Sequence, residues 1–370
     1  MRVLQLITQA RGGPVDHAVD VAVELAQRGH DSHLVGPVGP YAAAAVAAGV
    51  AVHHADVRSK TDVVGGRAVS RIVADVRPDV VHLQDRRAGL VGRVLALRSG
   101  VPTVYTLHGV PDPLAPLVPG NAVITPARRR DRIDNLVLER VLARTPRSVV
   151  VTPCEALARY ARVHVGVPAH RVHTVHNGVG RPWLEGPDAA EQSSGAAVNA
   201  VWLGVMQPVK RVPALVRAAA TVPDLRLQLV GDGPERARIE AAVEVSGAAD
   251  RVSFAGFQQE PAPFLRSADL VVLPSAAEAC PMALLQAMAC AVPVIASRAG
   301  GIPEIVRDRV DGLLVDTGSE DQLAAALAEL TADASLRHRL GRSARARVLG
   351  QFTVEHCVQR LLDVYEGVIR

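Results

Sequence analysis

A short stretch in the second half of the chain has the residue types of a binding site for a diphosphate. The segment EACPMALLQ places Glu278 and Gln286 at the two ends of an apolar run. Pro281 fits the first turn of a helix, because its missing N–H costs nothing there. The free N–H groups of residues 282–284 and the helix dipole would then attract an anion. Glu278 and Gln286 could flank that anion; the alternative is a capping glutamate and a solvated glutamine.

A lysine precedes this stretch in a chain that has almost no other. Lys60 and Lys210 are the only lysines among 41 basic residues. Lys210 ends a proline-containing loop after a predicted strand, where an ammonium group can contact a phosphate oxygen as a point charge. The alternative is an ordinary surface lysine. Its rarity makes Lys210, with the neighbouring Arg211, a candidate for binding the diphosphate.

The first half of the chain offers two weaker candidates at predicted strand ends. Gly12 and Gly13 stand directly before a predicted helix, and glycine lets backbone approach a ligand closely. His108 ends the apolar run 101–109. The chain has 13 histidines, so a structural role for His108 is the alternative. The turn LVGDGPE and the segment GGIPEIV are interpreted mainly as structural turns.

These residues fall at strand ends because short apolar runs alternate with helical patterns along the whole chain. Continuous Val, Ile and Leu runs joined by helices predict parallel sheets covered on both faces. In such sheets, ligands bind beyond the carboxyl ends of the strands. The predicted strands are residues 2–8, 31–37, 80–84, 101–109, 148–154, 199–206, 225–233, 251–257, 269–275, 292–297 and 311–315.

The strands form two series, which predicts an α/β protein of two doubly wound, Rossmann-like domains facing an inter-domain cleft. We expect an N-terminal domain at 1–180 and a C-terminal domain at 198–350, which carries the predicted diphosphate site at Glu278. Residues 181–197 are rich in Gly, Pro and Ser and have the composition of a linker. The last segment, 351–370, is expected to be a helix that packs back towards the N-terminal domain.

Composition excludes several other classes of protein. The net charge of +4 is too small to indicate nucleic acid. The four cysteines contain no CxxC pair, so neither a zinc site nor a disulfide framework is expected. Arg11 comes too early for the apolar core of a signal peptide, and the longest apolar run, 42–52, is too short to cross a bilayer. These features predict a soluble, cytoplasmic protein.

Eight motifs in order resemble the family-4 glycosyltransferases, retaining enzymes of the GT-B fold, over essentially the whole chain. The motifs are the early GG, LHG, HNGV, the strand–Gly–loop–Lys segment, LVGDGP, VSFAGF, LPSAAE and GGIPEIV with DGLLV. The resemblance implies a nucleotide-sugar donor, with a UDP-sugar favoured, and no metal or other cofactor. No acidic DxD pair stands out, which agrees with a metal-free site.

The resemblance also implies residue roles. Glu278, Lys210 and His108 would be catalytic, with Glu278 and His108 near the donor sugar and Lys210 on the diphosphate. Gln286 stands where the family's second Glu grips the ribose. The remaining expected donor contacts are Gly12, Gly13, Arg211, Gly256, Phe257, Met282, Ala283 and Leu284.

The chain departs from the family pattern at four positions. Gln286 replaces a Glu, Val205 replaces an Arg that partners the lysine, Ala291 replaces a Gly before VPV, and Gly180 replaces an Asp after NGV. A neutral acceptor in place of a charged one costs about 1 kcal/mol, whereas a lost Arg–phosphate contact costs about 1.5–3 kcal/mol. Arg211 could substitute for that Arg. Two alternatives remain open: a catalytically weakened nucleotide-sugar-binding partner protein, and a nucleotide-sugar epimerase.

The acceptor is expected on the first domain and could be a small molecule, a glycan or a lipid-linked sugar. Candidate contacts are Arg11, Asp16, His17, Asp85 and Arg86. Residues 128–147 carry seven Arg against three acidic residues, with apolar residues at helical spacing. This segment could be a basic amphipathic helix that contacts an anionic membrane surface, which would place the protein peripherally at the inner membrane. The alternative is an ordinary solvated helix. The Arg- and Ala-rich composition suggests a bacterial glycan or natural-product pathway.

Overall fold

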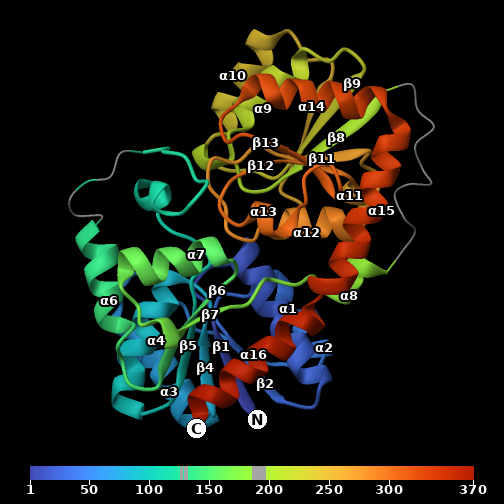
Figure 1. The fold of residues 1–370 in the computed structure, drawn as a ribbon. Helices are drawn as coiled ribbons and strands as arrows, with labels where there is room; N and C mark the ends of the chain where they lie inside the picture. Colours follow the sequence, from blue (N-terminus) through green and yellow to red (C-terminus); the bar gives the residue numbers. More distant parts are fainter. Residues whose placement is uncertain (126–127, 129–131, 186–196) are drawn as a thin grey trace. The chain divides into compact units, whose positions relative to one another are not determined.

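The computed structural model describes residues 1–125, 128, 132–185 and 197–370. The chain divides into two compact units, and each is a parallel sheet with helices on both faces (Figure 1). Unit 1 comprises residues 1–110, 127–180 and 354–370, and unit 2 comprises 111–126 and 181–353. The predicted fold class, two parallel α/β domains, is confirmed.

The sheet of unit 1 has seven strands in the order β3-β2-β1-β4-β5-β6-β7, and every neighbouring pair is parallel. Five of these strands lie within predicted runs. The two edge strands, β3 and β7, were not predicted, because each is only three residues long and has no continuous apolar run. The strands are β1 (Arg2–Leu6), β2 (Asp31–Val35), β3 (Ala51–His53), β4 (Val80–Leu83), β5 (Thr103–Thr106), β6 (Ser148–Thr152) and β7 (Val172–Thr174).

The sheet of unit 2 has six parallel strands in the order β10-β9-β8-β11-β12-β13. All six coincide with predicted strands. Its core is aliphatic apart from Trp202, which is fully buried on β8. The strands are β8 (Val198–Leu203), β9 (Leu225–Val230), β10 (Val252–Gly256), β11 (Leu270–Leu273), β12 (Val294–Ser297) and β13 (Gly312–Val315).

Amphipathic helices cover both sheets. In unit 1 they are α1 (Gly13–Gln27), α2 (Ala42–Ala47), α3 (Val63–Val76), α4 (Arg86–Ser99), α6 (Leu138–Leu142), α7 (Glu155–Tyr160) and α16 (Val354–Ile369). In unit 2 they are α8 (Arg181–Leu184), α9 (Val212–Ala220), α10 (Arg236–Ser246), α11 (Ala262–Arg266), α12 (Met282–Ala289), α13 (Ile302–Ile305), α14 (Glu320–Ala332) and α15 (Ala334–Gln351). No helix in the described ranges has the length and apolar character needed to cross a membrane.

The C-terminal helix α16 is part of the core of unit 1. Val358 and Tyr365 are fully buried and belong to the same cluster as Val3 of β1 and Val104 of β5. Central strands of the sheet and the C-terminal helix thus share one apolar core. The helix preceding it, α15, belongs to unit 2.

Residues 111–126 belong to unit 2, although the expected boundary placed all of 1–180 in one domain. Backbone hydrogen bonding explains the difference: the N–H of Ala122 donates to the carbonyl of Ala276, at 2.8 Å. In addition, the hydroxyl of Thr317 donates to the carbonyl of Gly120, at 3.1 Å. In the predicted linker, 181–184 form α8, and 186–196 lie outside the described residues.

The end of α12 explains why the family has glycine where this chain has Ala291. The N–H of Val292 donates to the carbonyl of Ala287, and that of Ala291 to Met288, each at 3.1 Å. This is the Schellman arrangement, which needs a left-handed residue at its centre. Ala291 adopts φ of 59°, a conformation that costs an L-residue about 1–2 kcal/mol.

We predict that Ala291→Gly leaves the free energy of unfolding within about 1 kcal/mol of wild type, because the contributing terms nearly cancel. Relief of the left-handed strain is offset by loss of a buried methyl, about 0.8 kcal/mol, and by the greater freedom of glycine in the unfolded chain. Ala296 on β12 is equally buried but has no positive φ. Ala296→Gly should therefore lose about 1–2 kcal/mol. Equal losses for the two variants in urea unfolding would contradict this account.

Candidate functional site

The site in unit 2 centres on an ion pair between the two residues singled out from the sequence. The Nζ of Lys210 lies 2.6 Å from Oε1 of Glu278. Lys210 ends the short 3-10 turn η7 (Pro208–Lys210) after β8, and Glu278 lies in the loop after β11. Both side chains are largely buried. Because parallel strands β8 and β11 are neighbours, their carboxyl ends bring the two loops together.

The helix α12 begins beside this loop, as predicted, with Pro281 preceding its first residue. The N–H of Leu284 donates to the carbonyl of Pro281 at 3.1 Å, so only two of the three expected N–H groups lack a bond within the described chain. These are the N–H groups of Met282 and Ala283. Gln286 is buried, so the alternative of a solvated glutamine is wrong.

Two residues that the sequence did not single out hold the Glu278 loop. The backbone N–H of Glu278 donates to Oδ1 of Asn121, at 3.1 Å. Gly300 has φ of 49°, and a Cβ placed on it would lie 1.8 Å from the carbonyl oxygen of Glu278. The glycine pair in GGIPEIV was a signal for a tight turn. Asn121 carried no signal, because its contact depends on a segment 157 residues away in sequence.

Glycines of the LVGDGPE turn pack against the loop that leads to Lys210. A Cβ on Gly231 would lie 1.8 Å from the carbonyl oxygen of Gly204, and one on Gly233 would lie 2.6 Å from that of Met206. The structural interpretation of this turn is confirmed. Close backbone packing against this turn thus determines the shape of the loop before Lys210.

The remaining donor candidates of unit 2 have varied surroundings. The guanidinium of Arg211 donates to the carbonyl of Gly318 at 3.1 Å and lies 3.8 Å from Glu320. It is therefore engaged by the loop before α14. Gly256, with φ of 70°, ends β10, and the adjoining Phe257 is half exposed.

The candidates of unit 1 gather at the carboxyl ends of β1, β4 and β5. Gly12 caps α1 with φ of 105°, and its missing Cβ would meet nothing within 4 Å, which leaves room for a ligand. The rings of His17 and His108 lie edge to face with centroids 5.0 Å apart. Nε2 of His108 lies 2.9 Å from Oε1 of Gln84. Burial lowers the pKa of His108 well below its ordinary value, and that of His17 to about 4.

Asp16 and Asp20 form an acidic pair one turn apart on α1. Burial raises the pKa of Asp16 to about 6, partly offset by a hydrogen bond from Tyr41. Burial, with the nearby Asp16, raises the pKa of Asp20 to about 7, while the backbone N–H of Gly180 lowers it. A Cβ on Gly180 would lie 2.9 Å from Oδ1 of Asp20. A side chain at position 180 would therefore meet the carboxyl group of Asp20.

Asp85 has a structural role in this fold. Its Oδ1 accepts from the backbone N–H groups of Arg87 and Ala88 at 2.9 Å, which caps α4, and from the hydroxyl of Thr8 at 2.7 Å. Its Oδ2 accepts from the N–H of Thr8. We therefore no longer propose Asp85 as an acceptor contact. Arg11 and Arg86 are exposed.

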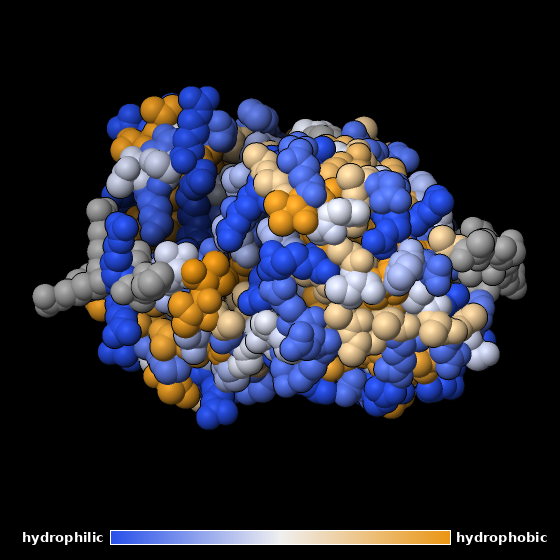
Figure 2. All heavy atoms as spheres, turned by 90° about the horizontal axis from the view of Figure 1, so that it is seen from above, coloured by the Kyte–Doolittle hydropathy of each residue, from blue (hydrophilic) through white to orange (hydrophobic). Residues whose placement is uncertain are grey.

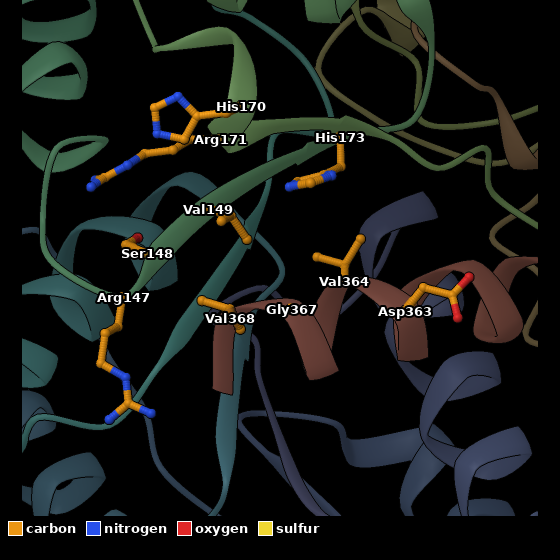
Figure 3. A pocket seen from close by; sticks show the side chains of 10 residues that line it. All are labelled: Arg147, Ser148, Val149, His170, Arg171, His173, Asp363, Val364, Gly367 and Val368. Atoms are coloured by element: carbon orange, nitrogen blue, oxygen red, sulfur yellow. The ribbon is translucent and has the colours of Figure 1, made fainter. Parts of the chain in front are cut away.

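A cavity of about 420 Å³ in unit 1 lies elsewhere, at the amino ends of β6 and β7 and beside α16. Figure 3 shows the guanidinium groups of Arg147 and Arg171 on one side of it and the carboxylate of Asp363 on the other. Both arginines donate to backbone carbonyls, of Ile369 and of Ala143 and Thr145 respectively. This end of the sheet is opposite to the one that carries the candidate site.

Part of the basic segment 128–147 lies outside the described residues, at 129–131. Its described part is the π-helical turn η3 (Ile133–Val137), followed by α6. Val137 and Val141 are 55% and 63% exposed, and Arg140 and Arg144 are exposed beside them. On the face drawn in Figure 2, hydrophilic and apolar residues are interspersed.

No group of three His, Cys, Asp or Glu side chains in the described ranges is placed to hold a metal ion. The positive charge of the site comes from Lys210 and the start of α12.

Two parallel-sheet units of this kind define the GT-B class of proteins. The solved structure of HepE from Anabaena in complex with UDP-glucose is similar over 99% of this chain and 100% of that chain, with a TM-score of 0.83 and 21% identity. Residues 11–180 match the model of Glycosyltransferase Family 4, and residues 197–347 match that of Glycosyl transferases group 1.

The chain belongs to the family-4 glycosyltransferases, enzymes that depend on a nucleotide sugar. It is 30% identical to a D-inositol 3-phosphate glycosyltransferase of Mycolicibacterium vanbaalenii, over 97% of this chain and 86% of the relative. It is 26% identical to an N-acetyl-alpha-D-glucosaminyl L-malate synthase of Bacillus anthracis, over 97% and 95% of the two chains.

We predict that Gly300→Ala destabilises unit 2 by more than about 2 kcal/mol, because the new methyl meets the backbone of Glu278 in a left-handed conformation. The matched control is Gly350→Ala on α15, whose Cβ would meet nothing within 4 Å. That variant should be stabilised by about 0.5–1 kcal/mol, since alanine is the better helix former. Thermal unfolding of both variants tests the close approach, and an unchanged melting temperature for Gly300→Ala would refute it.

Proposed function

We propose that this enzyme transfers a sugar from a UDP-sugar to a hydroxyl group of an acceptor, with retention at the anomeric carbon and without a metal ion. The observation that carries the proposal is the Lys210–Glu278 ion pair next to the start of α12. A point charge, two N–H groups that bond to no other described residue and a carboxylate lie in adjoining loops of one unit. These are the groups that a nucleotide diphosphate sugar requires.

The proposed chemistry is electrostatic. As the bond from the sugar to the diphosphate breaks, negative charge grows on the leaving diphosphate and positive charge on the sugar. The acceptor oxygen then bonds to the anomeric carbon, and its proton passes to the departing diphosphate. Lys210 and the N–H groups of Met282 and Ala283 stabilise the leaving group. Glu278 holds Lys210 in place and accepts hydrogen bonds from sugar hydroxyls. No protein nucleophile is assigned.

UDP is the proposed nucleotide. HepE, which shares this fold, was solved with UDP and with UDP-glucose. In this chain, the backbone at Gly256 and Phe257 would receive the base, and the buried Gln286 would bind a ribose hydroxyl. A half-exposed aromatic ring and an amide are suited to these two neutral groups.

The acceptor is proposed to bind unit 1 near Asp16, His17 and Arg86. Asp16 lies in the first turn of α1, close to Gly12 and to the His17–His108 ring pair. A half-buried carboxyl group can accept hydrogen bonds from several hydroxyl groups of a polyol or sugar. A free acceptor, a glycan and a lipid-linked acceptor would all make these contacts.

The charge of Lys210 is tested with its matched control, the chain's only other lysine. Lys210→Ala should lower transfer about a hundredfold or more and weaken UDP binding, because it removes a charge-assisted contact to the diphosphate. Lys60→Ala removes an exposed lysine and should behave as wild type. The measurements are initial rates with UDP-sugars and calorimetric titration with UDP.

Circular dichroism would establish that both variants are folded. Near-normal transfer by folded Lys210→Ala would sink the assignment. Glu278→Ala should behave like Lys210→Ala in transfer.

An anionic membrane surface is the proposed partner of the described face of η3 and α6. Val137 and Val141 lie one helical turn apart and are exposed, with Arg140 between them in sequence and exposed as well. Exposed aliphatic residues beside arginines suit the interface of a bilayer with acidic lipids. Such contact would bring the enzyme to a lipid-linked acceptor.

We predict that Val137→Asp with Val141→Asp abolishes binding to vesicles of phosphatidylglycerol and phosphatidylcholine. The wild type should co-sediment at low salt and be released at high salt, because screening weakens attraction to the surface. Val245→Asp serves as the control, since Val245 is 90% exposed on α10 of unit 2. Absence of wild-type binding at low salt would remove the membrane proposal and leave the transfer proposal untouched.

A further inference from the structure

Five polar side chains meet in the core of unit 1 behind His108. Gln5 of β1, His82 of β4, Gln84, Thr106 of β5 and Tyr365 of α16 are all at most 1% exposed. Buried polar groups are costly unless each is hydrogen-bonded. Such a set therefore specifies its own arrangement, and the direction of each hydrogen bond constrains the next.

The two glutamine amides are oriented by each other and by the tyrosine. Nε2 of Gln84 donates to Oε1 of Gln5, at 2.7 Å. Nε2 of Gln5 in turn donates to the hydroxyl oxygen of Tyr365, at 3.3 Å. With its amide nitrogen committed to Gln5, Gln84 has its carbonyl oxygen on the opposite side.

The contacts of His82 agree with this direction. Its Nδ1 lies 2.6 Å from the hydroxyl of Tyr365 and 3.3 Å from Nε2 of Gln84. An amide N–H requires an acceptor, so Nδ1 carries a lone pair and receives the tyrosine proton. The other nitrogen, Nε2, then donates to the hydroxyl of Thr106, at 2.6 Å. Burial supports this neutral form, because it lowers the pKa of His82 well below its ordinary value.

The chain of hydrogen bonds ends at His108. Oε1 of Gln84 lies 2.9 Å from Nε2 of His108. A carbonyl oxygen can only accept, so the proton of His108 is on Nε2. Nδ1 of His108 makes no hydrogen bond within the described part of the chain, and the ring is half-buried. The lone pair on Nδ1 is therefore available to a ligand.

We propose that Gln84 is a positioning residue, which holds His108 in the neutral form with its proton on Nε2 so that Nδ1 accepts a hydrogen bond from a hydroxyl group of the acceptor bound to unit 1. This rests on the proposed function, in which the acceptor binds unit 1 close to the His17–His108 ring pair. The orientation of Gln84 is itself maintained by Gln5 and by Tyr365 of the C-terminal helix. The titratable groups that face His108 are His17 of α1 and His82 of β4, and burial keeps both neutral at pH 7.

The direct test is nitrogen NMR of histidine-labelled full-length protein without any nucleotide sugar. The His108 signals are assigned by their absence in His108→Gln. We expect a protonated Nε2 and an unprotonated Nδ1 from pH 5 to 8 in the wild type. In Gln84→Met the acceptor is gone, and His108 should become a mixture of tautomers. A wild-type proton on Nδ1, or an unchanged tautomer in Gln84→Met, would overturn the proposal.

Kinetics provide the functional arm. Gln84→Met should lower kcat/KM for the acceptor about tenfold, the value of one hydrogen bond to its hydroxyl group, and leave the inhibition constant of UDP unchanged. Gln84→Glu keeps an acceptor for Nε2–H but also favours the charged imidazolium. Its activity should therefore approach that of wild type at pH 8 and fall below it at pH 6. Equal loss at both pH values would indicate a merely structural role and contradict the proposal.

The control variant is Gln359→Met, an exposed glutamine of α16 that accepts a hydrogen bond from Arg28. It should match the wild type in both arms. Because the NMR arm needs no substrate, its failure would leave the proposed transfer standing. If the wild type had no transfer activity, the proposed function would be refuted, and the tautomer of His108 could still be measured by NMR.

Discussion

Every strand in both sheets runs parallel to its neighbours, and the candidate chemistry depends on this constraint. Parallel ladders satisfy the backbone inside the sheets and cover both faces with helices, so a ligand can be reached only at strand ends. In unit 2 the ends of β8 and β11 bring Lys210 to Glu278. In unit 1 the ends of β4 and β5 bring Gln84 to His108. The two pairs arise from the same geometric rule.

Backbone contacts hold the charged groups in place. The backbone N–H of Glu278 donates to the side chain of Asn121. Its carbonyl oxygen packs against Gly300, where a Cβ would not fit. The loop before Lys210 packs so closely on Gly231 and Gly233 that a side chain at either position would not fit. Such contacts preorganise the ion pair without using its hydrogen-bonding capacity, so the polar atoms stay available for a substrate.

The sequence predicted the strands of both sheets apart from the two short edge strands, because aliphatic runs report burial directly. It also identified Lys210, because lysine is rare in this chain, and Glu278, because a carboxylate precedes an apolar helix start there. It could not find Asn121 or the role of Gln84, because both act through contacts between distant segments. Asp85 looked like a ligand contact and proved to be a helix cap, since a carboxylate before a helix fits either role. Ala291 departs from the family's glycine, yet its backbone adopts the left-handed conformation that favours glycine.

The placement of α16 has a consequence for the order in which the protein is made. Tyr365 and its neighbours complete the core of unit 1, whose other segments end at residue 180. The 173 residues from 181 to 353 must be synthesised in between. At about 5–20 residues per second, the first unit waits roughly 10 to 35 seconds on the ribosome with an apolar face uncovered. The N-terminal unit, although begun first, is the last to be finished.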